Sequence, residues 1–110
     1  MKTEKNQALT EKDLLKQVMD YLALHRIFHW RANTGAFAKE YKGKRHFVRF
    51  GIAGVPDILG CHRGRMFGIE CKKIGEEQSQ KQRVFQSDLD AAGGKYVLCY
   101  KLEDVMEALR

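Results

Sequence analysis

The sequence predicts a single mixed α/β domain in which helices flank a small β-sheet. Apolar residues recur at helical spacing after Thr10, and two strand-like runs are joined by a short turn at Gly64. A second helical segment is followed by the apolar run "KYVLCY". With 110 residues, 44% of them hydrophobic, the chain 1–110 is expected to form one domain around one core. The predicted order is a helix, several strands, a helix, a strand and a final helix.

The first helix is predicted from about residue 11 to residue 25. Thr10 suits the N-cap position, and Glu11 and Asp13 in the first turn would favour the helix dipole. Glu11 also falls on the apolar line of the helix, so its carboxylate is predicted either to face inward or to serve the dipole alone. The apolar residues at helical spacing are Leu14, Leu15, Val18, Met19 and Leu22.

A segment rich in Lys, Arg and aromatic residues follows this helix. Residues 27–30 are expected to form a short strand, and residues 31–49 an extended loop or irregular hairpin closed by "HFVRF". Cations interleaved with aromatic residues predict a phosphate-binding surface, although an ordinary solvated basic loop is the alternative. The candidate DNA-binding cations are Lys39, Lys42, Lys44, Arg45 and Arg49.

The second half of the chain carries the clearest turn and cap signals. The runs "VPDILGC" and "MFGIECKK" are joined by "HRGR", which predicts an antiparallel hairpin because Gly64 accepts a positive φ. Ser79 and Gln82 form a capping-box pattern at the start of the second helix. Gly93 and Gly94 are expected to end that helix before the strand "KYVLCY", and "EDVMEALR" predicts a short last helix.

The predicted hairpin brings together charged residues that are far apart in the sequence. Opposed residues of an antiparallel pair have a constant sum of residue numbers, and a turn centred between Arg63 and Gly64 makes that sum 127. Asp57 then lies opposite Glu70, and Lys72 points to the same face. The prediction depends on the turn, since a slip of one residue would put the two acids on opposite faces.

Two facing carboxylates repel each other and favour a bound cation. Mg²⁺ prefers oxygen ligands and often takes one or two carboxylates together with waters and a substrate phosphate. A neighbouring lysine could orient a water or neutralise developing charge during hydrolysis of a phosphodiester. The alternative is that Glu70 and Lys72 form surface charge pairs and that Asp57 belongs to a Pro-Asp turn. The strand-like context of "GIECKK" argues against this alternative, because unpaired charges in a central strand are costly.

The amino-acid composition indicates which kind of partner and which cellular compartment to expect. Lys and Arg outnumber Asp and Glu by 20 to 14, a net charge of +6 that favours a polyanionic partner such as nucleic acid. No run approaches the ~18 apolar residues of a membrane span, and the first residues lack an apolar signal-peptide core. The three cysteines lack zinc-ligand spacing and are predicted to be reduced core thiols. A cytoplasmic protein without a membrane partner is expected.

The ordered motifs resemble the VRR-NUC branch of the PD-(D/E)xK nucleases, from about residue 10 to residue 105. The shared pattern comprises an early helix glutamate, the basic turn "RANTG", then "GVPDI", "IECK", and "SQKQ" at the start of the second helix. The resemblance implies a PD-(D/E)xK restriction-endonuclease-like core with αβββαβ order plus a C-terminal helix. One departure is Cys71 at the central position of the ExK motif, where a β-branched residue is more usual.

The resemblance also implies roles for single residues. Asp57 and Glu70 would be ligands of Mg²⁺ or Mn²⁺ together with the backbone carbonyl of Cys71, and Lys72 would be the catalytic lysine. Gln82 matches the motif glutamine that lies near the site, and this role is compatible with the capping box.

Further residues belong to the same set of candidates. Glu11 matches the helix glutamate and is a candidate catalytic residue and possible metal ligand. Arg31 and Asn33 of the basic turn are candidate DNA contacts. Arg63 in the hairpin turn is predicted to touch a backbone phosphate or to be merely exposed.

The function implied by the resemblance is that of a metal-dependent DNA endonuclease that leaves 5′-phosphate and 3′-hydroxyl ends. The 110 residues contain no separate DNA-reading domain, so selectivity for DNA shape is expected. A Holliday-junction or branched-DNA resolvase acting as a homodimer, in a bacterial or phage-infected cell, is the favoured class. The alternatives are a partner-targeted restriction- or repair-type nuclease and a non-enzymatic DNA-binding module of the same fold.

Overall fold

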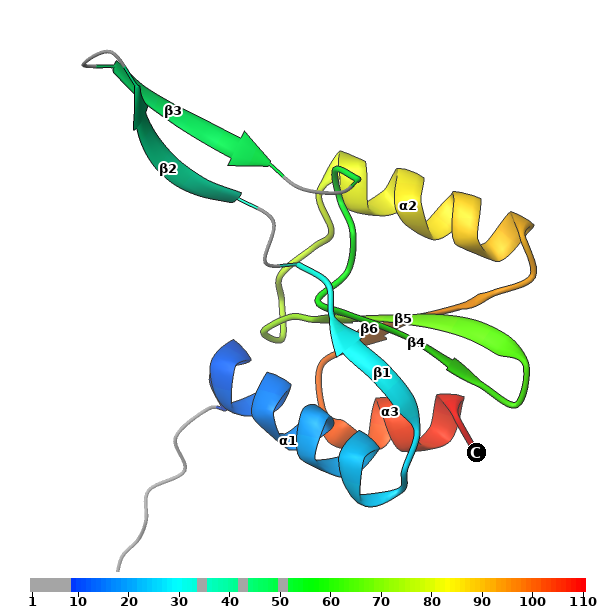
Figure 1. Cartoon of the computed structure of the whole chain (residues 1–110). Helices are drawn as coiled ribbons and strands as arrows, with labels where there is room; N and C mark the ends of the chain where they lie inside the picture. Colours follow the sequence, from blue (N-terminus) through cyan, green and yellow to red (C-terminus); the bar gives the residue numbers. More distant parts are fainter. Residues whose placement is uncertain (1–8, 34–35, 42–43, 50–51) are drawn as a thin grey trace, which may run out of the picture.

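The computed structural model describes residues 9–33, 36–41, 44–49 and 52–110, and of residues 36–49 only the backbone. Three helices and six strands are present in these residues (Figure 1). In chain order they are α1 (Glu11–Leu24), β1 (Phe28–Arg31), β2 (Ala36–Tyr41), β3 (Lys44–Arg49), β4 (Ile58–His62), β5 (Arg65–Cys71), α2 (Gln80–Ala91), β6 (Lys95–Cys99) and α3 (Leu102–Ala108).

Four of the strands form one mixed sheet in the order β1-β4-β5-β6. The first three strands pair antiparallel, and β6 pairs parallel to β5 after the crossover through α2. β2 and β3 pair with each other and, in the described residues, form a second, two-stranded sheet. The α/β class is therefore confirmed, and the elements of the main sheet follow the predicted order of helix, three strands, helix, strand and last helix.

The helices cover the two faces of this sheet unequally. α1 and α3 lie on one face and α2 lies on the other (Figure 1). The main core fills the space under α1 and α3, and β5 contributes Phe67, Ile69 and Cys71 to it. Side chains alternate along a strand, so Gly68 and Glu70 of β5 point to the α2 face. From the helices and the C-cap of α3, this core receives Leu14, Val18, Leu22, Val105 and Leu109.

The helix ends follow the predicted cap chemistry. The Thr10 hydroxyl accepts a hydrogen bond from the Asp13 amide at 3.0 Å, and a capping box opens α2 at Ser79. Gly93 follows α2 with a φ of +89°, a conformation that favours glycine and ends the helix. None of the helices in the described part of the chain is long and apolar enough to span a membrane.

The prediction of three core thiols is wrong for one of them. Cys71 and Cys99 are buried and pair across β5 and β6, whereas Cys61 is exposed. Cys61 points to the α2 face, near the turn end of β4. α2 packs mainly against β6, and the corner of the sheet at Cys61 stays exposed, so the apolar sequence around Cys61 did not guarantee its burial.

The loop before β4 approaches the first turn of α2 closely at a glycine. Gly54 has a φ of +80°, and a Cβ atom there would overlap the backbone carbonyl of Lys81 and lie 2.9 Å from the amide of Gln82. This contact sets how near the start of α2 lies to the loop that carries Asp57.

We predict that Gly54→Ala destabilises the protein more than Gly64→Ala, by roughly 2 kcal/mol. Both glycines have a φ of +80°, so both substitutions introduce the same left-handed strain, but a Cβ on Gly64 meets nothing within 4 Å. The free energy of unfolding from denaturant titration measures the difference. Equal losses for the two variants would mean that the loop and α2 are not in close contact.

Candidate active site

The register of β4 against β5 is the one predicted from the turn. Ile58 pairs with Ile69 and His62 pairs with Arg65, so opposed residues sum to 127. One step beyond the first pair, Asp57 comes opposite Glu70. The Asp57 carboxylate reaches across to β5, where its Oδ2 accepts a hydrogen bond from the backbone amide of Cys71 at 2.9 Å.

Glu70 is the only charged side chain buried among the described residues, with 5% of its surface exposed. Its Oε2 accepts a hydrogen bond from Nε2 of Gln82 at 3.2 Å, whereas its buried Oε1 has no hydrogen-bond partner in the described part of the chain. The pKa of Glu70 is raised to about 7, first by burial and then by the nearby Asp57 carboxylate, while the charge of Lys72 acts in the opposite direction. Glu70 is therefore a carboxyl group whose ionisation is unfavourable in the absence of a bound cation.

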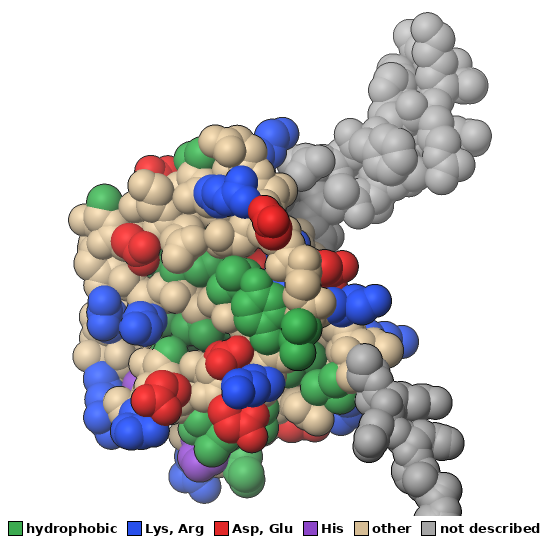
Figure 2. Space-filling model, turned by 180° about the vertical axis from the view of Figure 1, so that it is seen from behind, with side chains coloured by type: hydrophobic (Ala, Val, Ile, Leu, Met, Phe, Trp, Pro, Cys, Tyr) green, Lys and Arg blue, Asp and Glu red, His purple; other side chains and the backbone are tan. Residues whose placement is uncertain are grey.

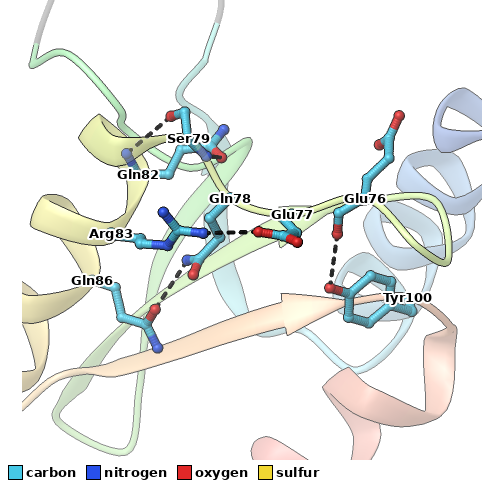
Figure 3. A network of polar contacts seen from close by, with 8 residues as sticks. All are labelled: Glu76, Glu77, Gln78, Ser79, Gln82, Arg83, Gln86 and Tyr100. Carbon is cyan, nitrogen blue, oxygen red and sulfur yellow. Dashed lines mark hydrogen bonds and ion pairs between the residues drawn. The ribbon is translucent and has the colours of Figure 1, made fainter.

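The Gln82 amide has two partners at once. Its Oε1 accepts a hydrogen bond from the Ser79 amide at 2.9 Å and completes the capping box, while its Nε2 donates to Glu70. The capping side of this arrangement is shown in Figure 3. Gln82 therefore takes part in the capping box and also lies beside Glu70, two roles that the sequence analysis treated as compatible. The start of α2 is thereby tied directly to the buried carboxyl group.

The segment between β5 and α2 is held by side-chain contacts on both sides (Figure 3). The Tyr100 hydroxyl donates to the Glu76 carbonyl at 3.1 Å, and Gln78 Nε2 donates to Gln86 Oε1 at 2.9 Å. Arg83 and Glu77 form an ion pair at 3.2 Å. These contacts fix the path of the chain from Glu70 to the helix that carries Gln82.

Lys72 lies where its charge acts on two acids. It is half-buried, and its backbone amide donates to the Cys99 carbonyl at 2.9 Å. Its positive charge acts against the upward pKa shifts of Glu70 and Glu11. A hydrogen bond with Glu76 is the main influence on Glu11 and raises its pKa, with burial adding to the shift. Glu11 thus borders the site, while its carboxyl group engages Glu76.

Asn33, which the sequence predicted as a DNA contact, and its neighbour Ala32 contact Asp57 in the structure. The Ala32 amide donates to the Asp57 carbonyl at 2.8 Å, and Asn33 Nδ2 approaches Asp57 Oδ1 at 3.4 Å. Asn33, a candidate DNA contact, therefore lies at the first acid of the site, and the exposed Arg31 ends β1 beside it. The pairing of β1 with β4 creates this contact, and no local sequence signal indicated it.

Tyr96 is a site neighbour that the sequence did not single out. It is buried on β6, and its hydroxyl makes no hydrogen bond within 3.5 Å to any described residue. The pKa of Tyr96 is raised to about 12, mainly by burial; the Gln78 side chain acts in the opposite direction, and the negative charges of Glu70 and Asp57 contribute to the rise. The site therefore contains two buried polar atoms without partners, the Tyr96 hydroxyl and one oxygen of Glu70.

One predicted DNA contact, Arg63, lies away from this site, and the side chains of five others lie outside what the structure describes. Arg63 lies at the turn end of β4 and β5, six residues along the chain from Asp57, or about 20 Å at the rise of a strand. Lys42 lies outside the described residues. Four other cations belong to β2 and β3, whose side chains are not described: Lys39, Lys44, Arg45 and Arg49.

The donor set fits a small divalent cation. No group of three or more His, Cys, Asp and Glu side chains suited to a metal occurs in the described ranges 9–33 and 52–110, so Glu11 does not complete a three-carboxylate cluster there. Mg²⁺ needs no such cluster, because one or two carboxylates with waters and a phosphate suffice. The partnerless Oε1 of Glu70 beside Asp57 is such a donor. Ligation by the Cys71 carbonyl stays a prediction.

An apolar groove lies beside the acids, between α2 and the β1–β4 part of the sheet. Two adjoining cavities of about 260 and 330 Å³ share Ile52, Met66 and Phe85 as lining residues. Trp30 of β1 lines the larger cavity and is 45% exposed. The groove is open to solvent, and its lining includes Ala32, which precedes Asn33, and Val55, which lies two residues before Asp57.

Comparison with known proteins adds no assignment to this geometry. The chain matches no family model, and no curated protein matches it. The relation to the VRR-NUC nucleases stays a prediction from the motifs around Asp57, Glu70 and Lys72, and the candidate site rests on the contacts described above.

We predict that Glu70→Gln stabilises the protein above neutral pH when divalent cations are removed with a chelator. The folded-state pKa of Glu70 is raised from 4.5 to about 7, so the folded protein retains a proton that the unfolded chain has lost in this window. Stability should therefore fall as the pH rises from 4.5 to 7, and at pH 8 the variant should be more stable by roughly 2 kcal/mol.

Denaturant titrations at pH 5 and pH 8 measure this effect. Glu107→Gln is the matched control, because Glu107 is an exposed residue of α3 that pairs with the exposed Arg110. The same pH dependence in the wild type and in Glu70→Gln would contradict the prediction.

Proposed function

We propose that the protein is a metal-dependent DNA endonuclease with a PD-(D/E)xK core of the VRR-NUC type. The observation that carries the proposal is the pair of acids at one end of the sheet, Asp57 and a buried Glu70 whose Oε1 has no partner. A purely structural strand would gain stability from an apolar residue at position 70. The four-stranded mixed sheet with α2 as its crossover is compatible with this core.

In this proposal, Asp57 and Glu70 would hold Mg²⁺ or Mn²⁺. The cation would supply Lewis-acid activation of a water and stabilisation of the phosphate charge. Gln82 holds one oxygen of Glu70 by its amide and leaves the other oxygen available. Asn33 and the Cys71 amide hold Asp57 in the same way, through donors that keep the carboxylate oriented.

Lys72 would be the catalytic lysine of this site. Its charge acts on Glu70, and no ion pair within 4 Å occupies it among the described residues. An ammonium group in this position can orient the attacking water and neutralise charge that develops on the phosphate. It would contribute to catalysis rather than to ligation of the cation.

DNA, and branched DNA in particular, is the proposed substrate. The net charge of +6 supports a polyanionic partner. The apolar groove with Trp30 and Phe85 offers aromatic surface beside the acids, where unpaired bases could stack. We further propose a homodimer, because paired nicks across a junction need two symmetric sites, and a cytoplasmic location in a bacterial or phage-infected cell.

Two alternatives predict different behaviour in the same assays. A partner-targeted nuclease would nick a single strand as a monomer and gain selectivity only with a second protein. A non-enzymatic DNA-binding module would bind DNA without cleaving it. Cleavage of duplex, single-stranded, flap and four-way-junction DNAs with Mg²⁺ and with Mn²⁺ separates the three functions.

We predict that Lys72→Ala lowers the cleavage rate by at least about 100-fold and leaves cation and DNA affinity nearly unchanged, because the lysine acts on the reacting groups. Cleavage assays and calorimetric titration with Mn²⁺ measure the two effects. Lys73→Ala is the matched control, since it removes the neighbouring exposed lysine.

Asp57→Asn should behave differently and lose cation binding and cleavage together. Wild-type turnover by Asp57→Asn, or equal losses for the two lysine variants, would contradict the proposed site.

We also predict that the protein is a homodimer when bound to a four-way junction. Each chain has one Asp57–Glu70 pair and cuts one strand per visit, so symmetric paired nicks require two chains. Light scattering with and without junction DNA measures the mass, for which one chain contributes 12.7 kDa. A monomer that makes paired nicks would rule out the dimer, and a monomer that makes single nicks would favour the partner-targeted nuclease.

A further inference from the structure

A basic pocket lies at the end of the sheet opposite to the candidate active site. It has a volume of about 200 Å³ and collects residues from the β4–β5 turn, the start of β6 and the end of α3. No acidic side chain from the described part of the chain lines it. The cations that line this pocket are Arg63, Arg65, Lys95 and Arg110, joined by His62.

Arg65 is held in place without losing its charge. Its Nε donates to the Gly93 carbonyl at 2.9 Å and its Nη2 donates to the Gly94 carbonyl at 3.2 Å. Backbone carbonyls orient a guanidinium but do not neutralise it, and a guanidinium has five N–H donors. Arg65 is therefore a pre-oriented cation with donors left for an anion, unlike Arg83, which pairs with a carboxylate.

Arg63 stands in a backbone conformation that its side chain does not favour. It has a φ of +54° and precedes Gly64 at +80°, the pattern of a two-residue hairpin turn in which Asn, Asp and Gly are preferred. Arginine gains nothing from this conformation, since it lacks the short polar side chain that suits it. The turn thus carries a cation at a position where Asn, Asp or Gly would make the protein more stable.

The base of the pocket strengthens its attraction for an anion. Phe67 is 1% exposed and Leu109 is 8% exposed, so an apolar floor of low dielectric lies under the cations. Arg110 is the weakest member, because it pairs with the exposed Glu107 at 3.0 Å. Lys and Arg side chains gather along the left edge of Figure 2, the edge to which the half-turn brings the β4–β5 turn.

The position of the pocket indicates which part of a ligand it meets. β5 runs from Arg65 at the pocket to Cys71 beside Asp57, which separates the two sites by about 20 Å. Phe67 and α3 place the pocket toward the α1–α3 face, whereas Glu70 points to the α2 face. A phosphate in the pocket therefore belongs to a different segment of the ligand from one at Glu70.

We propose that this basic pocket binds a backbone phosphate of a second DNA segment, such as another arm of a branched molecule. The identity of the ligand as DNA rests on the proposed function, and the pocket itself rests on Arg63, Arg65 and Lys95. Oriented guanidinium and ammonium donors over an apolar floor match a phosphodiester, which is a singly charged anion with two free oxygens.

Arg63→Gly tests the pocket without endangering the fold, because glycine suits a φ of +54°. Arg26→Gly is the matched control, since Arg26 is also exposed, has a φ of +56° and lies outside the pocket. Affinity for a four-way junction and for a linear duplex of the same arm length is measured at several salt concentrations. A chelator is present throughout, so cleavage plays no part in the result.

We expect Arg63→Gly to weaken junction binding about tenfold and to lower its salt slope by about one. The loss for the linear duplex should be smaller, and Arg26→Gly should resemble the wild type. Adding Lys95→Gln should enlarge the loss. Equal effects of the two arginine variants, or no effect of either, would overturn the proposal, as would equal losses for duplex and junction.

Inorganic phosphate distinguishes a small-anion site from a DNA site. A change in the His62 NMR signals with phosphate that disappears in Arg63→Gly, together with unchanged DNA affinity, would overturn the assignment to DNA. The two proposals also fail separately. If the wild type cleaves no DNA but Arg63→Gly still weakens junction binding, the proposed pocket stands and the proposed nuclease activity fails.

Discussion

The two-residue turn at Arg63 and Gly64 sets the register of β4 against β5, and the candidate site depends on that register. Both turn residues have positive φ, which matches the right-handed twist of the paired strands. With this turn, Ile58 pairs with Ile69 and both are fully buried. A slip of one residue would turn one of these side chains away from the α1–α3 core while it separated the two acids. Core packing and the site therefore favour the same register.

Glu70 shows what this arrangement costs the fold. A carboxyl group with 5% exposure, one neutral hydrogen-bond donor and a second acid beside it is ionised only against an unfavourable free energy. Gln82 reduces that cost on one oxygen, and Lys72 reduces it through its charge. A divalent cation would reduce it far more, because it would act on both acids at once. The energetic weakness of the unliganded site is thus a physical argument for the proposed cation.

The parts of the structure that the sequence predicts well are those decided by near neighbours. The capping box of Ser79 and Gln82 involves residues three apart, and the turn fixes the hairpin within a few positions. The contact of Asn33 with Asp57 spans 24 residues and requires the pairing of β1 with β4, which no local pattern indicates. The burial of Cys61 was predicted wrongly for a related reason. Whether a strand face is covered depends on where α2 packs, and that is a property of the whole domain.

The same hairpin also separates charges of opposite sign. The acids Asp57 and Glu70 lie at its open end and the cations Arg63 and Arg65 at its turn, about 20 Å away. This exceeds the Debye length of about 8 Å at physiological salt, so the distant cations do little to neutralise the acids. A polyanion can be attracted to the turn while the open end still repels phosphate. In the proposed mechanism, Lys72 and a divalent cation held by Asp57 and Glu70 would overcome this repulsion locally. Productive binding of DNA would then depend on the divalent ion, whereas the general attraction of DNA to the turn would not.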